Sequence, residues 1–455
     1  MTPAEIDALI DDRPQDGVFR VHAGALTRHD VFELEMKYIY ENTWVYVGLE
    51  YQIEKPHDFI TTRIGRQPVI VSRGADGKIH CLINSCRHRG AVVCELMQGN
   101  RKTHTCPYHA WTYDSAGNNV AVTAEDEGGY TPAFARENHS LRTVRVESYR
   151  GFIFASLNPD VPPLEQHLGD AKLFLDLAVD QGPDGLEVVP GTVTYTYPGN
   201  WKMQIENSAD QYHFIPTHQS YLQILGGRKQ AKTGDAPGSS RYMYSMRDLD
   251  RGTFTFERGH NVFWSAVEQP ELRPLWFHRE AVEQRLGAMR LKWMLYTRNL
   301  LLFPNFQLLE APILQVRINR PLAANKTEIT TYCLAPKGES KPARVRRIRQ
   351  YEEFYNPSGL ATPDDMAVFD ACQTGQQSDR VDWHQGYMRG IARVHWGPNA
   401  QARELGINPV TSVYNTDALG DETIFHSQYR EWRRLLMKGL GHVEGRPQLA
   451  RGAAE

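Results

Sequence analysis

The sequence predicts an α+β protein in which a small all-β module precedes a larger domain with helices flanking an antiparallel sheet. Short, β-branched runs separated by turn residues dominate residues 58–159. From there on, strand-like and helix-like patterns are mixed, which is typical of an antiparallel sheet with helices on it. The length of 455 residues is large for one domain and suits two.

The first elements are expected around the β module. Apolar side chains recur at three- and four-residue spacing over residues 27–47, which predicts a helix. Thr27, with Asp30 three residues later, resembles a capping box at its start. The runs FITTRI, PVIVSR and KIHCLIN predict strands, and GFIFASLNP predicts the strand that closes the module.

The larger domain is expected to begin with the helical run LEQHLGDAKLFLDLAV. VVPGTVTYTYPG predicts an edge strand, because prolines lie at its margins. A helix is expected over 200–213, and strands at NLLLFPNFQLL, ILQVRINRP and TEITTYCLAP. Further helices are expected at 342–355, 363–374 and 422–439.

These elements predict four parts of the chain. They are an N-terminal helical segment packed on the larger domain (1–45), the β module (46–158), the larger domain (159–442) and a loose C-terminal tail (443–455).

Composition excludes several classes of protein. The apolar content of 41%, the charged content of 23% and the net charge of -3 are ordinary, and favour neither a nucleic-acid nor a membrane-surface partner. The N-terminus does not resemble a signal peptide, and no apolar run is long enough to predict a membrane span. Six cysteines do not form a disulfide framework in so long a chain. A cytoplasmic location is the default expectation.

Two short segments of the β module each combine one cysteine with one histidine: Cys86 with His88, and Cys106 with His109. Two thiolates on one iron and two imidazoles on the other are the ligands of a Rieske [2Fe–2S] centre. A structural zinc site is an alternative, although zinc sites usually pair C-x₂₋₄-C with H-x₃₋₅-H. A metal-free group of buried residues is another. One Cys and one His in each segment favour the cluster.

A second constellation follows at the start of the larger domain. Glu206, Asp210 and His213 have the i, i+4, i+7 spacing of one helix face. Pro216 should end or bend that helix, and the bend can bring His218 to the same metal. Two histidines and a carboxylate form the facial triad of non-haem Fe(II) oxygenases. The alternative is a solvated helix face with two incidental histidines.

Together, the two motifs resemble one protein family. The C-x-H and C-x₂-H loops resemble the Rieske domain of aromatic ring-hydroxylating oxygenases. The motif N-W-K-x₃-E-N-x₂-D-x-Y-H-x₄-H resembles the catalytic-domain signature of that same family. The resemblance covers nearly the whole chain. The N-terminal region and the stretch YEEFYNPSGLATPDD are similar to the large subunits of benzoate, toluate and anthranilate dioxygenases.

The resemblance implies roles for individual residues. His213 and His218 are expected to bind a mononuclear Fe(II). Asp210 is expected to link His109 of a neighbouring subunit's cluster to that iron. Asn207 is expected to lie close to the iron or to line the pocket.

The third iron ligand is implied to come from the Gly…Asp-Asp stretch downstream, where Asp365 is the candidate and Asp364 the neighbour that competes with it. A structural interpretation stays open: Thr362 as N-cap, Pro363 at the first helical position and Asp365 at the third would form a simple capping box.

The activity implied by the resemblance is hydroxylation of an aromatic ring with O₂, most typically as a cis-dihydrodiol. Electrons would come from NADH through a reductase, with or without a ferredoxin. The chain itself shows no dinucleotide-binding fingerprint. The implied assembly is an α₃ homotrimer or an α₃β₃ hexamer with a small β subunit.

The substrate implied by the resemblance is an aromatic carboxylate such as benzoate or anthranilate. Arginine suits bidentate pairing with a carboxylate, and Arg317 in ILQVRINR is the candidate. The alternative is that Arg317 is an exposed strand residue.

Three other functions compete with the dioxygenase. A ring monooxygenase (salicylate hydroxylase-like) or a demethylase of the same architecture would use the same metal ligands. A pure Rieske electron carrier would need only the β module, and a zinc-bound scaffold would contain no iron.

Overall fold

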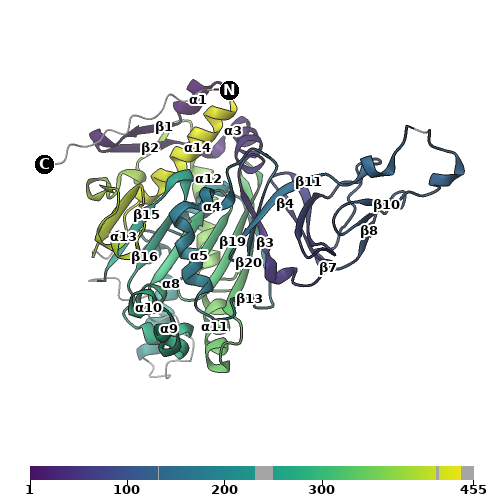
Figure 1. The fold of residues 1–455 in the computed structure, drawn as a ribbon. Helices are drawn as coiled ribbons and strands as arrows, with labels where there is room; N and C mark the ends of the chain where they lie inside the picture. The colour runs from purple at the N-terminus through teal and green to yellow at the C-terminus, as the bar shows by residue number, and fades with distance from the viewer. Residues whose placement is uncertain (132, 231–248, 417–419, 442–455) are drawn as a thin grey trace.

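The computed structural model describes residues 1–131, 133–230, 249–416 and 420–441, so the predicted tail at 443–455 lies outside the described residues. Figure 1 shows the β module projecting on one side of a larger unit of helices and strands. The predicted α+β class is confirmed, because every strand pair in the described sheets is antiparallel and helices pack around the largest sheet.

The β module contains two sheets, in the orders β3-β12-β11-β6-β5-β4-β7 and β10-β9-β8. The three predicted runs form neighbouring strands β4, β5 and β6, whereas β11 has no counterpart among the predicted strands. β11 alternates valines with polar and charged residues, so its apolar signal is weak. The strands are β3 (Val45–Leu49), β4 (Asp58–Ile64), β5 (Gln67–Arg73), β6 (Ile79–Ile83), β7 (Gln98–Asn100), β8 (Thr103–Thr105), β9 (Thr112–Asp114), β10 (Asn119–Ala121), β11 (Thr143–Tyr149) and β12 (Phe152–Ser156).

The N-terminal segment is not wholly helical. It contains a hairpin, whose second strand pairs with β21 (Trp383–His384) of the larger unit. The helix predicted at 27–47 is broken, and Thr27 does not cap it. The Thr27 hydroxyl instead donates to the Ala23 carbonyl (3.0 Å), since Thr27 ends the preceding short helix. The elements are α1 (Pro3–Asp7), β1 (Ile10–Arg13), β2 (Val18–His22), α2 (Gly24–Thr27), α3 (His29–Glu35) and a π-helical turn (Met36–Tyr40).

The larger unit is built on one antiparallel sheet, in the order β13-β20-β19-β18-β17-β16-β15-β23-β22, with β14 also paired to β20. The predicted edge strand VVPGTVTYTYPG is therefore two short strands, β13 and β14. The strands are β13 (Leu186–Val188), β14 (Val193–Tyr197), β15 (Arg251–Thr255), β16 (Asn261–Ser265), β17 (Thr297–Leu302), β18 (Phe306–Glu310), β19 (Leu314–Ala323), β20 (Lys326–Pro336), β22 (His395–Trp396) and β23 (Thr411–Asn415).

Helices pack around this sheet, and the three predicted near the C-terminus are confirmed as α11, α12 and α14. The helix predicted at 200–213 ends early, at Asn207. No described helix is long and apolar enough to cross a membrane. The helices are α4 (Leu164–Leu168), α5 (Lys172–Val179), α6 (Trp201–Asn207), α7 (Phe214–Thr217), α8 (Gln219–Gln230), α9 (Arg279–Leu286), α10 (Ala288–Leu295), α11 (Lys341–Phe354), α12 (Thr362–Gly375), α13 (Ala400–Leu405) and α14 (His426–Gly439).

A buried ion pair fixes the position of α6. Lys202 on α6 contacts Glu35 on α3, and both side chains are buried. The indole N–H of Trp201 donates to one Glu35 oxygen (2.8 Å), and that of Trp432 on α14 donates to the other (2.7 Å). Buried charges need such additional hydrogen bonds to offset the cost of desolvation. Residues from both ends of the chain therefore hold α6, and α14 lies beside α1 in Figure 1.

Candidate metal centres and active site

The two cysteine–histidine segments, here called the cluster loops (86–91 and 106–111), have the same backbone conformation. In each loop the cysteine N–H donates to the carbonyl five residues later, and the cysteine carbonyl accepts from the N–H four residues later, at 2.8–3.0 Å. The residue before the last has a positive φ in both, at Gly90 and Ala110. Cys86 and Cys106 thus occupy equivalent positions.

The cluster loops separate thiols from imidazoles. Cys86 and Cys106 are 4% and 2% exposed, whereas His88 is exposed and His109 half-buried. The two imidazole rings lie with their centroids 4.4 Å apart. This division suits a [2Fe–2S] cluster with two unlike irons, in which Cys86 and Cys106 would hold one iron and His88 and His109 the other.

Two further contacts fit a cluster in these loops. The Nδ1 atom of His109 is buried and has no hydrogen-bond partner in the part of the chain that the structure describes, as expected of a nitrogen reserved for a metal. The Tyr113 hydroxyl accepts from the Arg87 N–H (3.0 Å), so its own hydrogen is free to point at Cys86 Sγ, 3.3 Å away. A hydrogen bond to a cluster sulfur is one way in which a protein tunes the reduction potential.

The second constellation is arranged differently from the predicted helix face. Because α6 ends at Asn207, Glu206, Asp210 and His213 do not share one face, and that prediction is wrong. Asp210 Oδ1 accepts from the N–H groups of Tyr212 (2.7 Å) and His213 (3.3 Å). A carboxylate that binds nearby backbone donors in this way competes with helical hydrogen bonding.

Glu206 points away from the two histidines. Its carboxyl group accepts from the hydroxyls of Tyr387 (3.2 Å) and Tyr429, and burial raises its pKa to about 8. Pro216 does not end a helix either, since it lies within the short helix α7. A second turn of helix after the irregular segment, and not a proline bend, brings His218 back toward His213.

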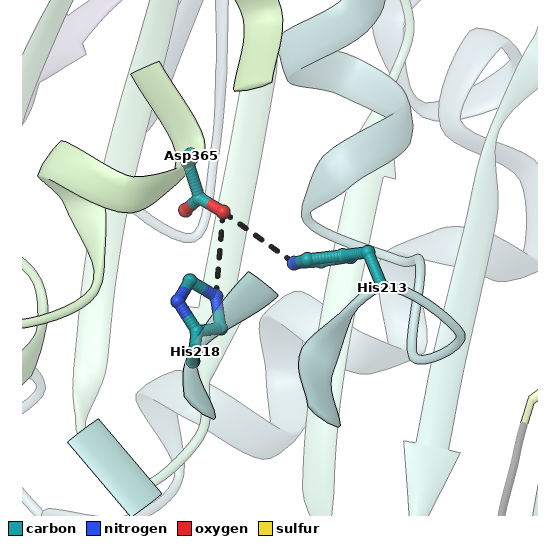
Figure 2. A group of neighbouring side chains, drawn as sticks. All are labelled: His213, His218 and Asp365. Carbon is teal, nitrogen blue, oxygen red and sulfur yellow. Dashed lines mark ion pairs between the residues drawn. The ribbon is translucent and has the colours of Figure 1, made fainter. Parts of the chain in front are cut away.

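Figure 2 shows the outcome: His213, His218 and Asp365 converge on one point. One ligand atom from each lies within 4.8 Å of the other two. Asp365 Oδ1 is 3.5 Å from His213 Nε2 and 3.3 Å from His218 Nε2. His218 and Asp365 are 2% and 7% exposed. Among the described residues this is the one such group of three that offers suitable donor atoms to a single ion.

The two aspartates that sequence could not separate take different positions. Asp365 belongs to the group of three, while Asp364 Oδ2 lies 3.4 Å from His218 Nδ1, on the other side of that imidazole. The capping-box interpretation is wrong. The Thr362 hydroxyl donates to the Tyr355 carbonyl, and α12 has no side-chain cap.

Each of the two histidines therefore has a carboxylate behind it. Asp210 Oδ2 lies 3.1 Å from His213 Nδ1, and Asp364 Oδ2 lies 3.4 Å from His218 Nδ1. Carboxylates at this nitrogen fix the tautomer and the ring orientation of metal-binding histidines. Asn207 completes the arrangement, because its amide nitrogen lies 3.1 Å from His213 Nε2 and 3.0 Å from Asp365 Oδ1.

The electrostatics of this group favour a cation. Burial lowers the pKa of His213, but its hydrogen bonds to Asp210 and Asp365 outweigh burial and raise the pKa to about 10. Burial raises the pKa of Asp365, and the two histidines outweigh it and hold that pKa well below its usual range. Positive charge between these groups is thus stabilised, and a metal ion supplies it as well as a proton does.

The group of three lies in the wall of a cavity that is partly open to solvent. The cavity wall combines aromatic and aliphatic side chains with a few polar ones, which is usual for a small-molecule site. Residues of its apolar wall include Phe214, Leu249, Phe263, Val267, Leu309 and Phe354.

Arg317 also lines this cavity, and it is 4% exposed, so the interpretation as an exposed strand residue is wrong. Its Nε donates to Gln315 Oε1 (3.1 Å), and its guanidinium lies over the Tyr355 ring at 5.6 Å. Gln315 was missed in the sequence. The alternation of strand β19 places it on the same face as Arg317, which was the available signal.

Comparison with known proteins identifies both units. Residues 43–149 match the Rieske [2Fe-2S] domain family, and residues 186–420, more than half of the chain, match the ring hydroxylating alpha subunit (catalytic domain) family. The chain belongs to the ring-hydroxylating oxygenase alpha subunits. The predicted family, enzyme class and pair of iron cofactors are thereby confirmed. A pure electron carrier and a zinc scaffold are excluded, because neither would contain the catalytic domain.

Relatives of this alpha subunit cover its whole length. It is 40% identical to the alpha subunit of toluate 1,2-dioxygenase from Pseudomonas putida, over 97% of this chain and 96% of the relative. It is 40% identical to the large subunit of anthranilate 1,2-dioxygenase from Acinetobacter baylyi, over 96% and 93%.

A solved structure of naphthalene 1,2-dioxygenase with indole in its active site has a TM-score of 0.77, with 25% identity and 92% of each chain covered. The curated relatives named here are dioxygenases, and they give no support to the monooxygenase or demethylase alternatives.

Proposed function

We propose that this alpha subunit dihydroxylates the ring of an aromatic carboxylate. The observation that carries the proposal is a buried arginine, Arg317, in the wall of the same cavity as the three candidate iron ligands. Toluate and anthranilate, named in two relatives, are both aromatic carboxylates. The apolar wall suits the ring, and Arg317 suits the carboxylate.

His213, His218 and Asp365 are the proposed ligands of the mononuclear Fe(II). Two histidines and one carboxylate on one side of the metal leave positions open for O₂. When bound, the cluster supplies electrons one at a time and the mononuclear iron activates O₂ beside the substrate. Arg317 has the task of holding the ring at the end of the cavity where this happens.

The cluster ligands are proposed to be Cys86, Cys106, His88 and His109. The exposed imidazole edge suits exchange of electrons with another protein surface. We propose that this surface includes the region of Asp210, whose side chain is one-fifth exposed and contacts His213. A carboxylate there can accept a hydrogen bond from His109 of a neighbouring copy while it holds His213.

This bridge requires a second copy of the chain, and the proposed assembly that supplies it is a trimer, α₃ or α₃β₃ with a small β subunit. A reductase that oxidises NADH, directly or through a ferredoxin, completes the system. The proposed boundaries of the units are those predicted, 46–158 for the cluster domain and 159–442 for the catalytic domain.

A single turnover of the pre-reduced holoenzyme with ¹⁸O₂ tests this proposal. The substrates are benzoate, anthranilate, salicylate and 2-chlorobenzoate, and the products are read by mass spectrometry. Two labelled oxygens in one product are expected. One labelled oxygen would replace the dioxygenase by a monooxygenase. No product from any acid, with both iron centres loaded, would overturn the substrate class.

A further inference from the structure

Three other buried arginines in the described part of this chain, Arg273, Arg298 and Arg347, lie within 4.0 Å of a carboxylate. Arg298 pairs with Glu310, and Arg347 pairs with Glu339 at 2.9 Å. Arg317 differs, because no carboxylate of the described residues lies within 4.0 Å of its guanidinium nitrogens. Burying a charge without a counter-charge is costly. The burial of an unpaired arginine at position 317 therefore calls for a functional explanation.

Three neutral side chains feel the charge of Arg317. They are the phenols of Tyr195, Tyr351 and Tyr355. Burial raises the pKa of Tyr195 to about 12 and also raises the pKa of each of the other two above its usual value. All three are therefore uncharged near neutral pH. The Tyr355 ring lies under the guanidinium, with its centroid 5.6 Å away, and none of the three phenols neutralises the positive charge.

Gln315 is an uncharged hydrogen-bonding partner of the guanidinium. It is fully buried, and its amide oxygen accepts from Arg317 Nε at 3.1 Å. Its amide nitrogen donates to Thr331 Oγ1 at 3.0 Å, and Thr331 in turn contacts the Tyr351 hydroxyl at 2.8 Å. Because Thr331 takes the amide N–H, the amide oxygen is directed at Arg317. Among the described residues no other hydrogen-bond acceptor for the guanidinium is found, and Arg317 lines the cavity with its remaining N–H groups.

Glutamine at this position has the shape of glutamate without its charge. A glutamate would accept the same hydrogen bond from Arg317 and would supply the counter-charge internally. The protein would then supply the counter-charge of the guanidinium, and the cavity would no longer bind an aromatic acid in preference to a neutral aromatic compound. The identity of this one residue thus decides where the counter-charge comes from.

We propose that Gln315 is the specificity-determining residue of the cavity: it orients Arg317 without neutralising it, so that the substrate carboxylate must complete the ion pair. The inference rests on the proposed aromatic-carboxylate activity and adds the residue that makes the cavity select for a carboxylate. Gln315 acts through Arg317 and is a positioning residue, since it contacts the guanidinium and not the substrate.

The test compares Gln315→Glu with Gln315→Met in the holoenzyme. Binding of benzoate and of its neutral isostere benzamide is measured by anaerobic calorimetry, together with KM and kcat. Wild type should prefer benzoate. Gln315→Glu should weaken benzoate on the order of tenfold or more while benzamide changes little, because a charged hydrogen-bonded pair contributes about 1.5–3 kcal/mol. Gln315→Met, which is uncharged, should weaken benzoate less and keep a preference for the acid.

Several results would overturn the inference. Equal weakening of benzoate and benzamide in Gln315→Glu would mean that Gln315 only packs. Unchanged benzoate binding in both variants would mean that it does not control Arg317. The visible cluster spectrum and the iron content report whether each variant folds and loads. If Gln315→Glu does not load, Gln315→Met decides, because benzoate binding equal to wild type would refute the orienting role.

A separate variant distinguishes failure of the proposed function. Arg317→Met should abolish the preference for benzoate while leaving benzamide binding in place. If wild type itself binds benzoate no better than benzamide, the aromatic-carboxylate proposal fails and the role of Gln315 fails with it. If Arg317→Met behaves as expected and Gln315→Glu equals wild type, only the further inference fails.

Discussion

At the cluster loops the candidate ligands lie close together in sequence, and the histidines reach the protein surface. At the iron site the ligands come from elements distant in sequence and are largely buried. Two tight turns of the same kind set the thiols inward and the imidazoles outward. The iron site needs α12 to bring Asp365 to the two histidines around α7. The first arrangement suits exchange of electrons across a surface. The second suits chemistry that must be kept from solvent.

The comparison also separates what each region depends on. The cluster loops are shaped by hydrogen bonds within each loop, so the cluster itself should complete the fold of its module. The iron site is positioned by the surrounding fold and by carboxylates behind each histidine. Loss of a cluster ligand should therefore unfold the β module, whereas loss of an iron-site ligand should only remove the mononuclear iron. Four predictions test this difference, from the largest effect to the smallest.

Cys106→Ser should have the largest effect. It removes a cluster ligand, and because cluster binding is coupled to folding, the β module should lose both its visible absorption and its cooperative unfolding. Iron should fall from about three to about one per chain, since a Rieske centre holds two irons. Visible spectroscopy, iron analysis and thermal unfolding measure this. A variant with an unchanged visible spectrum would contradict the assignment.

His213→Ala should abolish product formation but spare the fold. The visible spectrum of the cluster should persist, and iron should fall from about three to about two per chain, because the lost ligand belongs to the mononuclear site. Iron analysis beside the visible spectrum distinguishes this variant from Cys106→Ser. Retained activity would refute the ligand role of His213.

Asp210→Asn should keep both iron centres and slow the passage of electrons between them. The substitution removes the negative charge beside His213 Nδ1 but keeps the shape of the side chain. Loss of such a partner costs about 10- to 100-fold in metalloenzymes. Stopped-flow reoxidation of the reduced cluster in a single turnover measures the rate. A normal rate with normal metal content would place the bridge elsewhere.

Asp364→Asn should have the smallest effect. Asp364 contacts the Nδ1 side of His218 and is partly exposed, so its loss should weaken iron binding about tenfold while the site still loads. Asp365→Asn is the matched control and should fail to load iron. Chelator competition measures both affinities. The reverse outcome would exchange the roles of the two aspartates.

Local patterns predicted much of this molecule. β4, β5 and β6 were found because their apolar runs are bounded by turns, and the cluster loops because each of two short segments combines one cysteine with one histidine. The iron site was found by resemblance, because the helix-face argument fails. The helix that the spacing assumed ends at Asn207, and the Asp210 carboxylate accepts hydrogen bonds from the backbone that follows it. Thr27 failed as a cap for a similar reason, because the preceding helix uses it.

Long-range contacts supplied the rest. Which of the two aspartates faces the histidines depends on where α12 starts relative to α7, and no local pattern fixes that. The burial of Arg317 is equally invisible in sequence, since strand alternation gives two faces without saying that both are covered. The sequence therefore identified the residue types, and the packing of helices and sheet determined which residues they contact.

The buried contact of Glu35 with Lys202, Trp201 and Trp432 has a consequence for biosynthesis. Trp432 lies on α14, so the Glu35 carboxylate that holds α6 acquires this hydrogen bond only after residue 432 has been synthesised. The β module, complete by residue 156, can fold much earlier, because domains generally fold as units during synthesis. The order of synthesis therefore allows the iron–sulfur cluster to be loaded before the ligands of the mononuclear iron are in place.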